Sequence, residues 1–314
     1  MKFSIIIPTY NEANDIAATL EALLDLDYPD QETIVVDDST DRTPEIVRQY
    51  GDKGVRLIHP GGGGRCEARN IGIREAAGEV VVLLNADVRP RTDFLKRLAP
   101  HYQQGADYVL VEARVANRQD LFARYVDCVS QVFYGRGANC NYDNMEWTEG
   151  FSCRKEAALK AGLFPTGFPV PICAGEDGFF GNGLRGIGAK KVIDLSLRVE
   201  HLVPASFREF WHNRKGRGAG SAQVHRFLDR WPFWRILLWN SLKTVKTLVW
   251  LATLAPALGT CLNAVRYSDR GMSDLFPFFY AYAVEQVAAQ WGEWQATCAI
   301  LEKERQHRAG KPCR

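Results

Sequence analysis

Two short acidic segments could hold a metal ion or accept a proton. Asn85-Ala86-Asp87 follows an apolar run at 80–84, and Glu176-Asp177 follows a loop rich in proline and glycine, just before a predicted helix. One or two carboxylates are enough for Mg²⁺ or Mn²⁺, which also take water and substrate phosphates as ligands. A carboxylate beside a helix N-terminus stays ionised and can serve as a general base. Each segment also has a plainer interpretation, a strand-ending turn or a helix cap.

The surrounding pattern predicts a parallel α/β sheet in the first 111 residues. Short β-branched runs, typical of strands buried on both faces, alternate with segments of helical period that close on glycine. The expected strands are 3–8, 32–38, 55–60 and 79–85, and the expected helices lie within 12–26, 43–51 and 66–78. Ligands bind at the carboxyl ends of such strands. All four strands end in polar or turn residues, at 9–12, 37–39, 61–64 and 85–87.

Two of these strand ends could bind a nucleotide. Asp37-Asp38 could accept hydrogen bonds from a base imide or a ribose hydroxyl, although a helix cap is the alternative. The glycines at 61–64 would let a nucleotide approach the backbone, with Arg65 and Arg69 available for a diphosphate. The alternative is a flexible loop. No Gly-Lys-Ser/Thr follows the glycines, so the segment is not a P-loop.

The composition excludes some classes of protein. The 314 residues include 39 basic and 37 acidic side chains, a near balance that does not indicate nucleic-acid binding. The eight cysteines form no C-x-x-C pair or zinc-finger spacing, which favours reduced thiols. The apolar run at the N-terminus is too short for a secretory signal, so we expect the protein in the cytoplasm.

The remainder of the chain predicts mixed structure followed by apolar helices. A strand is expected at 107–115, a helix at 121–133 and a loop-rich stretch at 135–150. Beyond Trp231 the sequence is apolar and rich in tryptophan, with basic residues nearby, and it is interrupted by Pro256 and Gly259. This pattern favours helices lying in a membrane interface. A helical packing domain is the alternative, and the length is marginal for a membrane span.

Six segments give the chain a resemblance to a known family. In order, they are SIIIPTYNEANDIAATLEALL, IVVDDSTDRT, ARNIGI, LLNADV, TEGFSCRKEA and GEDGFF. Their order and approximate spacing resemble those of family 2 glycosyltransferases, which are inverting enzymes of GT-A fold. The resemblance covers roughly residues 2 to 220. It implies a mixed α/β sheet of Rossmann-like type flanked by helices.

The resemblance also implies roles for particular residues. Asp177, with Glu176, matches the catalytic base motif, and Glu149-Gly150 matches the loop that faces the acceptor. Asp87 matches the metal-holding acid of a D-x-D motif whose first position is Asn85 here, and His201 stands where some relatives supply a metal ligand. The donor-binding residues implied are Pro8, Thr9, Tyr10, Glu12, Asp37, Asp38, Arg69, Asn85 and Ala86, with Arg214 and Arg217 near the diphosphate. For His201 a structural role, and for the basic pair a solvated face, are the alternatives.

These inferences combine into one functional prediction. A nucleotide-diphosphate sugar, most commonly a UDP-sugar in the family, would give its sugar to a hydroxyl of a saccharide or lipid-linked acceptor, with Mg²⁺ or Mn²⁺ as cofactor. The expected organisation is a catalytic domain at 1–225, an apolar helical region at 226–300 and a charged tail at 301–314. The expected location is the inner face of the cell membrane. A non-catalytic subunit that binds nucleotide sugars is the alternative, motivated by Asn85. A nucleotidyltransferase is disfavoured because no glycine-rich loop with lysine follows the first strand.

Overall fold

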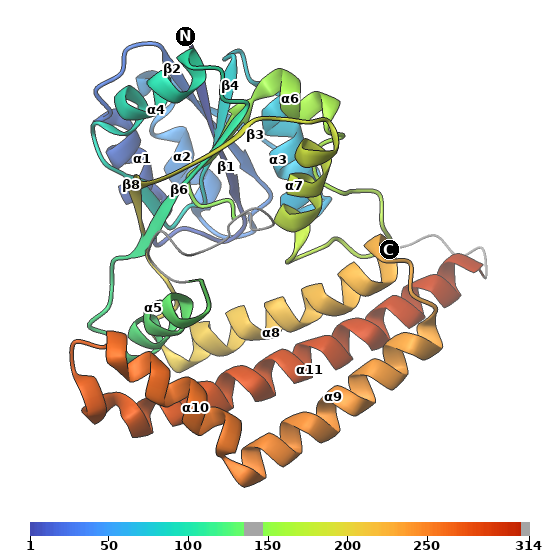
Figure 1. Cartoon of the computed structure of the whole chain (residues 1–314). Helices are drawn as coiled ribbons and strands as arrows, with labels where there is room; N and C mark the ends of the chain where they lie inside the picture. The colour runs from blue at the N-terminus through green and yellow to red at the C-terminus, as the bar shows by residue number, and fades with distance from the viewer. Residues whose placement is uncertain (135–146, 309–314) are drawn as a thin grey trace. The chain divides into compact units, whose positions relative to one another are not determined.

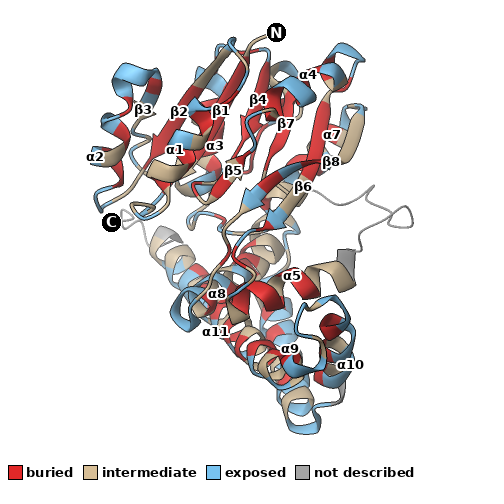
Figure 2. Cartoon of the chain, turned by 90° about the vertical axis from the view of Figure 1, so that its left-hand side faces the viewer, coloured by how far each residue is buried: buried red, intermediate tan, exposed pale blue. Residues whose placement is uncertain are grey.

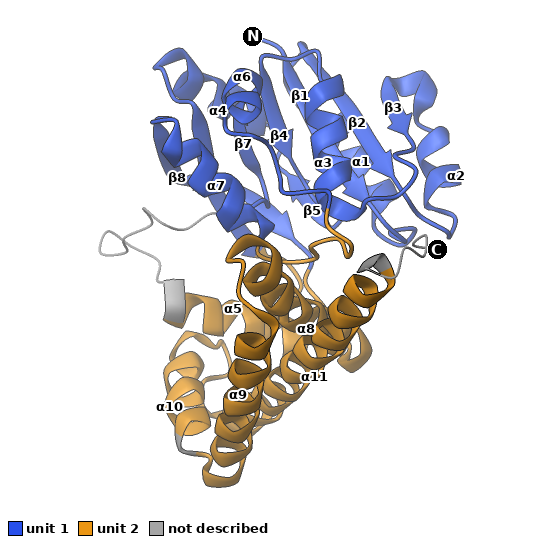
Figure 3. Ribbon diagram, turned by 90° about the vertical axis from the view of Figure 1, so that its right-hand side faces the viewer, with its two compact units in different colours: residues 1–114, 142–167, 176–202 blue, residues 115–141, 168–175, 203–314 orange. Residues whose placement is uncertain are grey.

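A computed structural model describes residues 1–134 and 147–308 of the chain. The chain forms two compact units (Figure 3). Unit 1 comprises residues 1–114, 142–167 and 176–202, and unit 2 comprises 115–141, 168–175 and 203–314. Most of the loop-rich stretch predicted at 135–150 lies outside the described residues. So do Cys140 and Cys313, whereas the other six cysteines are free thiols.

Strands and helices alternate along unit 1, and helices make up most of unit 2 (Figure 1). The strands are β1 (Phe3–Thr9), β2 (Gln31–Asp37), β3 (Val55–Ile58), β4 (Val80–Leu83), β5 (Val88–Pro90), β6 (Tyr108–Val115), β7 (Phe151–Arg154) and β8 (Lys191–His201). The helices of unit 1 are α1 (Ile16–Leu24), α2 (Thr43–Arg48), α3 (Gly64–Glu75), α4 (Phe94–Gln103), α6 (Lys155–Lys160) and α7 (Glu176–Gly186). The helices of unit 2 are α5 (Leu121–Tyr134), α8 (Phe207–Gln223), α9 (Phe233–Thr253), α10 (Ala255–Ala264) and α11 (Leu275–Arg308), with a π-helical turn η2 (Val224–Leu228) after α8.

The strands form one mixed sheet in the order β3-β2-β1-β4-β7-β6-β8-β5. β1, β2, β3 and β4 are parallel, which confirms the prediction for the N-terminal half. β7 runs antiparallel to β4 and β6, and β5 runs antiparallel to β8. The carboxyl ends of β1, β2 and β4 therefore meet at one edge, as the sequence predicts.

At the centre of the sheet, β1, β2 and β4 are largely buried on both faces, which explains their nearly continuous apolar sequences (Figure 2). On one face, Phe3, Ile5 and Ile7 pack in the core that includes α1 and α4. On the other face, Ile6 meets α3 so closely that a Cβ at Gly72 would lie 2.3 Å from its side chain. The period-2 alternation of β1 thus places helices on both sides of the sheet.

The predicted ends of two helices are wrong. The sequence suggested that α2 and α3 close on glycine, but their C-caps are Gln49 and Ala76. The glycine following α2 instead begins a short 3₁₀ helix, which ends at Gly54 in the left-handed conformation. In these two segments, the glycine lies in the turn that follows the helix and is not the C-cap residue.

Unit 2 is held by close helix packing. A Cβ at Gly218 of α8 would lie 1.8 Å from the carbonyl oxygen of Ala289 in α11, and a Cβ at Gly292 would lie 1.9 Å from that of Lys215. Helix α8 thus belongs with the C-terminal helices, and the boundary lies near residue 203 rather than at the predicted 225. Residues 301–308 of the predicted tail continue α11, and 309–314 lie outside the described residues.

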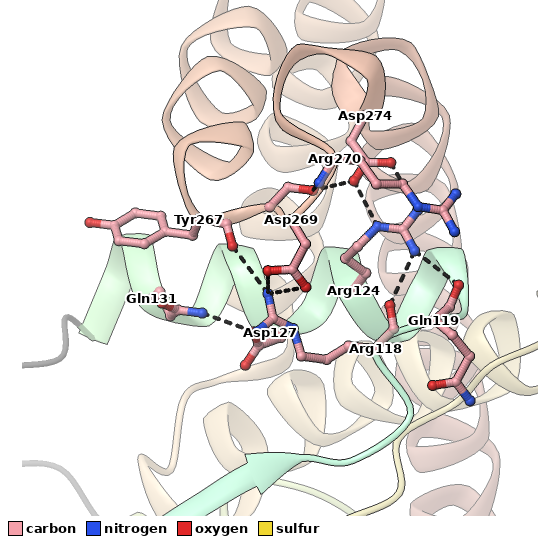
Figure 4. A network of polar contacts seen from close by, with 10 residues as sticks. Arg118, Gln119, Arg124, Asp127, Gln131, Tyr267, Asp269, Arg270 and Asp274 are labelled. Atoms are coloured by element: carbon pink, nitrogen blue, oxygen red, sulfur yellow. Dashed lines mark hydrogen bonds and ion pairs between the residues drawn. The ribbon is translucent and has the colours of Figure 1, made fainter.

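A network of ion pairs joins α5 to the segment before α11 (Figure 4). The Arg124 guanidinium, buried, donates to both carboxylate oxygens of Asp274 at 2.6 and 2.8 Å. Arg118 bridges Asp127 and Asp269 at 3.2 and 3.3 Å. Although burial alone would raise it, the hydrogen bonds from Arg124 and Ser268 hold the pKa of Asp274 below its usual value. The network therefore stabilises unit 2 at neutral pH.

The apolar C-terminal sequence forms α9 and α10. Within the described residues, no individual helix is both long and apolar enough to cross a membrane. Phe233–Thr253 and Pro256–Tyr267 satisfy that criterion only together, as a pair bent by 70°.

Candidate active site

The predicted base-reading acids stand at the end of β2 and differ in accessibility. Asp37 is buried, and its Oδ1 accepts hydrogen bonds from Thr9 Oγ1 at 2.7 Å and Ser39 Oγ at 2.6 Å. Asp38 is half-buried, and its backbone N–H donates to the Thr9 carbonyl. Asp37 therefore ties two strand ends together, and Asp38 is the more accessible of the pair. Of the other predicted donor residues, Tyr10 is 63% exposed and Pro8 lies within β1.

Asn11, which sequence reasoning did not select, joins the loops after β1 and β2. Its Oδ1 accepts hydrogen bonds from the N–H groups of Thr40 and Asp41 at 2.9 and 3.2 Å, and its own N–H donates to Ser39 Oγ. Its φ is 59°, a left-handed conformation that asparagine tolerates better than most residues. An asparagine two residues after the end of a buried strand was the available signal.

Arg69 lies at the centre of a buried polar group. Its guanidinium donates to Glu176 Oε1 at 2.6 Å, Thr148 Oγ1 at 2.9 Å and Asn85 Oδ1 at 3.3 Å. The side chain is 1% exposed. Arg69 thus joins α3 to α7, to the loop before β7 and to the loop after β4, and these contacts fit positioning better than direct contact with a diphosphate. They also give Asn85 a defined partner.

The two predicted catalytic acids begin α7, and their environments differ. Burial alone raises the pKa of Glu176, but the charges of Arg69 and Arg65 outweigh it and hold that pKa below the usual value. For Asp177, burial and the neighbouring charges of Glu176 and Glu149 raise the pKa to about 6. Glu176 is therefore a fixed anion, and Asp177 can exchange a proton near neutral pH.

The pairing of β5 with β8 brings His201 to Asp87. Val88 is opposite His201 in the antiparallel register, and the Leu202 N–H donates to the Asp87 carbonyl at 2.9 Å. His201 Nε2 lies 3.5 Å from Asp87 Oδ2. The adjacent Ala86 is buried, and its carbonyl accepts a hydrogen bond from Thr19. The two predicted metal ligands thus lie together, although 113 residues in between had left their proximity open.

Glu12 and Arg65 are further charged groups at this edge. Burial, with the charges of Asp87 and Asp15, raises the pKa of Glu12 to about 7. Arg65 is 53% exposed, 4.0 Å from Glu176 Oε1, at the start of α3 after four glycines of positive φ. Of the two arginines that the sequence offered for a diphosphate, Arg65 is therefore the accessible one, whereas the family resemblance had assigned the donor-binding role to Arg69.

The predicted acceptor loop precedes β7. Gly150 has a φ of +79°, and a Cβ there would lie 2.6 Å from Val111 Cγ2 and 3.0 Å from Val199 Cγ1. Its N–H donates to the Leu83 carbonyl. Gly150 thus lets this loop lie close to the sheet, and Glu149 is near enough to raise the pKa of Asp177.

The basic pair predicted near the diphosphate belongs to unit 2. Arg214 is buried in α8, with its Nε 3.2 Å from Glu285 Oε1 and its guanidinium over the Phe210 ring. Arg217 is exposed on the same helix. The contacts of Arg214 indicate a role in packing unit 2, and a diphosphate-binding role for either residue stays a prediction.

The residues around Asp87 fit a divalent cation that takes part of its ligands from the substrate. Asp87 Oδ1 is buried without a hydrogen-bond partner, so one carboxylate oxygen is available for a ligand. Across 1–134 and 147–308, no three histidine, cysteine or acidic side chains form a group able to hold a metal ion. The described protein groups thus supply few ligands, as is usual for Mg²⁺ bound with phosphates.

Comparison with known proteins assigns the family. Residues 4–161 match Glycosyl transferase family 2. The chain is 35% identical over 124 residues to poly(ribitol-phosphate) beta-N-acetylglucosaminyltransferase TarS of Staphylococcus aureus, covering 37% of this chain and 22% of that protein. It is 39% identical over 100 residues to glycosyltransferase AglE of Haloferax volcanii, covering 30% and 33%. The matched region spans a third or less of each of these relatives.

Solved structures resemble the fold over nearly the whole chain. S. aureus TarS 1–349 in complex with UDP-GlcNAc superposes with a TM-score of 0.55 at 20% identity, covering 100% of this chain and 93% of that one. Mannosyltransferase PcManGT of Pyrobaculum calidifontis, in complex with GDP-Man and Mn²⁺, gives 0.52 at 20% identity, covering 99% and 76%. The fold is GT-A-like, as predicted. The chain belongs to glycosyl transferase family 2, which places it in the class of glycosyltransferases.

Proposed function

We propose that the protein transfers a sugar from a nucleotide-diphosphate sugar to an acceptor hydroxyl by a single inverting displacement. Family membership supports the reaction class. The observation that carries the proposal is the arrangement of Glu176 and Asp177, in which an arginine-paired acid lies beside a largely buried acid able to exchange a proton. These two carboxylates lie in the same unit as the acids that follow β2 and β4.

In the proposed reaction, Asp177 accepts the proton of the acceptor hydroxyl. The hydroxyl oxygen forms a bond to the anomeric carbon from the face opposite the diphosphate, while the bond from that carbon to the diphosphate oxygen breaks. The nucleoside diphosphate leaves with the electron pair, and the anomeric configuration inverts. Arg69 holds Glu176 and Asn85 in place, and no side chain forms a covalent intermediate.

Stabilising the leaving group requires positive charge. Arg65, exposed at the start of α3, is the protein's candidate cation. Asp87, with its free carboxylate oxygen, and His201 would hold a divalent cation, which supplies Lewis-acid stabilisation to the diphosphate when bound. The complex of the P. calidifontis mannosyltransferase with GDP-Man and Mn²⁺ supports this choice of cofactor.

The donor and acceptor belong to the proposal as well. The UDP-GlcNAc complex of S. aureus TarS supports a UDP-sugar donor, and the name of TarS refers to a polymeric acceptor. For this protein we propose a UDP-sugar donor and a saccharide or lipid-linked acceptor. Asp38 and Tyr10 are the accessible groups at the strand ends where the base would bind.

A donor screen tests this function. The full chain is incubated with UDP-, GDP- and TDP-sugars, with Mn²⁺, Mg²⁺ or chelator, and nucleoside diphosphate release is measured with and without candidate acceptors. We expect metal-dependent release of nucleoside diphosphate from one donor. The anomeric configuration of the product, determined by NMR, should be opposite to that of the donor. Tight donor binding without release or transfer would instead favour the non-catalytic subunit, and a retained configuration would exclude a single displacement.

A further inference from the structure

The buried side of helix α9 carries several polar side chains beside the buried Ile236. Asn240 Nδ2 donates to Thr297 Oγ1 of α11 at 2.8 Å, and both side chains are buried. Lys243 pairs with Glu293, whose side chain is fully buried. Thr244 Oγ1 accepts a hydrogen bond from Trp294 Nε1 at 2.9 Å. These contacts lie within unit 2 and fix which side of α9 faces α11.

The opposite side of α9 is apolar and exposed. Trp234, Leu238, Leu242, Val245 and Val249 follow one another at intervals of three or four residues, which places them on one stripe of the helix. Each is between 51 and 66% exposed, and Leu237 and Leu248 widen the stripe. A surface helix of a water-soluble protein instead turns its apolar side to the core and its polar side to water. An apolar surface of this extent marks a site of interaction rather than a solvated face.

The charges on α9 have one sign. Arg235 and Lys246 are exposed beside the stripe, and α9 contains no acidic residue. Arg235 lies over the Trp231 ring at 4.0 Å, and Lys246 lies over the Trp250 ring at 4.1 Å. Tryptophans paired with cations beside an apolar stripe are typical of helices at the boundary between lipid headgroups and acyl chains.

From these observations we propose that α9 binds an anionic lipid surface, lying in its plane. Trp234, Leu242 and Val245 enter the acyl region, and Arg235 and Lys246 contact headgroup phosphates. This inference rests on the polarity of α9 alone and is independent of the proposed reaction. It specifies which face of the predicted apolar region meets the membrane.

The contacts of α9 argue against the other occupants of this face. A helix crossing the bilayer would carry the Lys243–Glu293 pair into the hydrocarbon region, which is costly. If the α9 helix of a second copy covered the stripe, it would bring a second set of the cations Arg235 and Lys246 to the interface. Helix α9 contains no acidic residue to pair with them. An anionic lipid surface accommodates both features, because its acyl chains bury the apolar stripe and its headgroup phosphates pair with the cations.

Vesicle co-sedimentation of the full chain tests the proposal. We expect binding to phosphatidylcholine vesicles containing phosphatidylglycerol, and weaker binding to phosphatidylcholine alone. Leu242→Asp with Val245→Asp should weaken binding about tenfold or more, because two apolar side chains no longer enter the acyl region. Arg235→Gln and Lys246→Gln should each weaken binding about fivefold on anionic vesicles only. Leu159→Asp, which places an acid at an exposed leucine of unit 1, is the matched control and should bind normally.

Three results would overturn the proposal. The first is folded protein that does not sediment with either kind of vesicle. The second is vesicle-bound protein that resists extraction by sodium carbonate, which would indicate a membrane span. The third is a lipid-free dimer, seen by analytical ultracentrifugation, that Leu242→Asp with Val245→Asp converts to a monomer, because the face would then belong to a second copy.

Discussion

At the scale of single residues, adjacent acids acquire different properties from their neighbours. Glu176 receives a hydrogen bond from Arg69 and has a lowered pKa, whereas Asp177 lacks that partner and its pKa rises to about 6. The sequence Glu-Asp indicated a catalytic pair without separating the two roles. The separation depends on Arg69, which lies 107 residues earlier in the chain, and local sequence does not reveal such contacts.

The raised pKa of Asp177 predicts a pH profile. A general base must be ionised, so kcat/KM should fall about tenfold for each pH unit below about 6 and level off above it. Initial rates of sugar transfer between pH 4.5 and 8.5, at constant ionic strength and with folding monitored by circular dichroism, would measure it. A profile that stays level down to pH 4.5 would contradict a base with this environment.

Arg69 and Arg65 should give different mutant phenotypes. Arg69→Ala leaves Glu176 buried without its partner and should lower the free energy of unfolding by about 3–5 kcal/mol. Arg65→Ala changes an exposed side chain, so we expect unfolding to change by about 0.5 kcal/mol or less. It should raise the KM for the donor about tenfold through loss of a charged contact.

Urea unfolding and donor titrations would separate the two phenotypes. The opposite pattern, with Arg65 supporting stability and Arg69→Ala altering only the donor KM, would show that the sequence-based assignment of Arg69 to the diphosphate was correct.

At the scale of elements, register and close approach determine the site and the packing. The pairing of β5 with β8 places His201 beside Asp87, and the glycines of α8 and α11 allow their backbones to touch. The apolar runs predicted β1, β2 and β4 well because these strands are largely buried on both faces, and β3 was predicted although it is a partly exposed edge strand. Such runs could not predict β5, whose three residues leave too short a pattern.

Neighbouring glycines of α8 provide a matched test of helix packing. Gly218→Ala should destabilise the protein by about 1–3 kcal/mol, because its Cβ would meet the Ala289 carbonyl. Gly216→Ala, where nothing lies within 4 Å, should be neutral or stabilise by up to about 1 kcal/mol through helix propensity. Thermal and urea unfolding would compare them. Equal effects of the two substitutions would contradict the close contact of α8 with α11.

At the scale of the whole molecule, one chain contains a GT-A-like unit and a helical unit in which α9 exposes an apolar stripe. The sequence identified the family, because motifs such as the Asn-Ala-Asp triplet lie at buried strand ends with fixed spacing. It placed the boundary at 225 because the resemblance extends to about residue 220 and the composition becomes apolar beyond Trp231. The packing of α8 on α11 instead assigns α8 to unit 2. The tryptophan-rich helix α9 was recognisable from composition, but its inverted polarity required the contacts of Asn240 and Lys243.

The most direct test of the central claim is the rate of sugar transfer by Asp177→Asn, measured with the donor found in the screen. Asp52→Asn, at an exposed acid of unit 1, is the control. Because the raised pKa of Asp177 means that its charge costs stability above pH 6, Asp177→Asn should unfold at the same temperature as the wild type or higher. We predict unchanged donor affinity and at least about a thousandfold loss of transfer. A transfer rate within about threefold of the wild-type rate would contradict the role of Asp177 as general base, because the loss of a general base lowers the rate by much more than that.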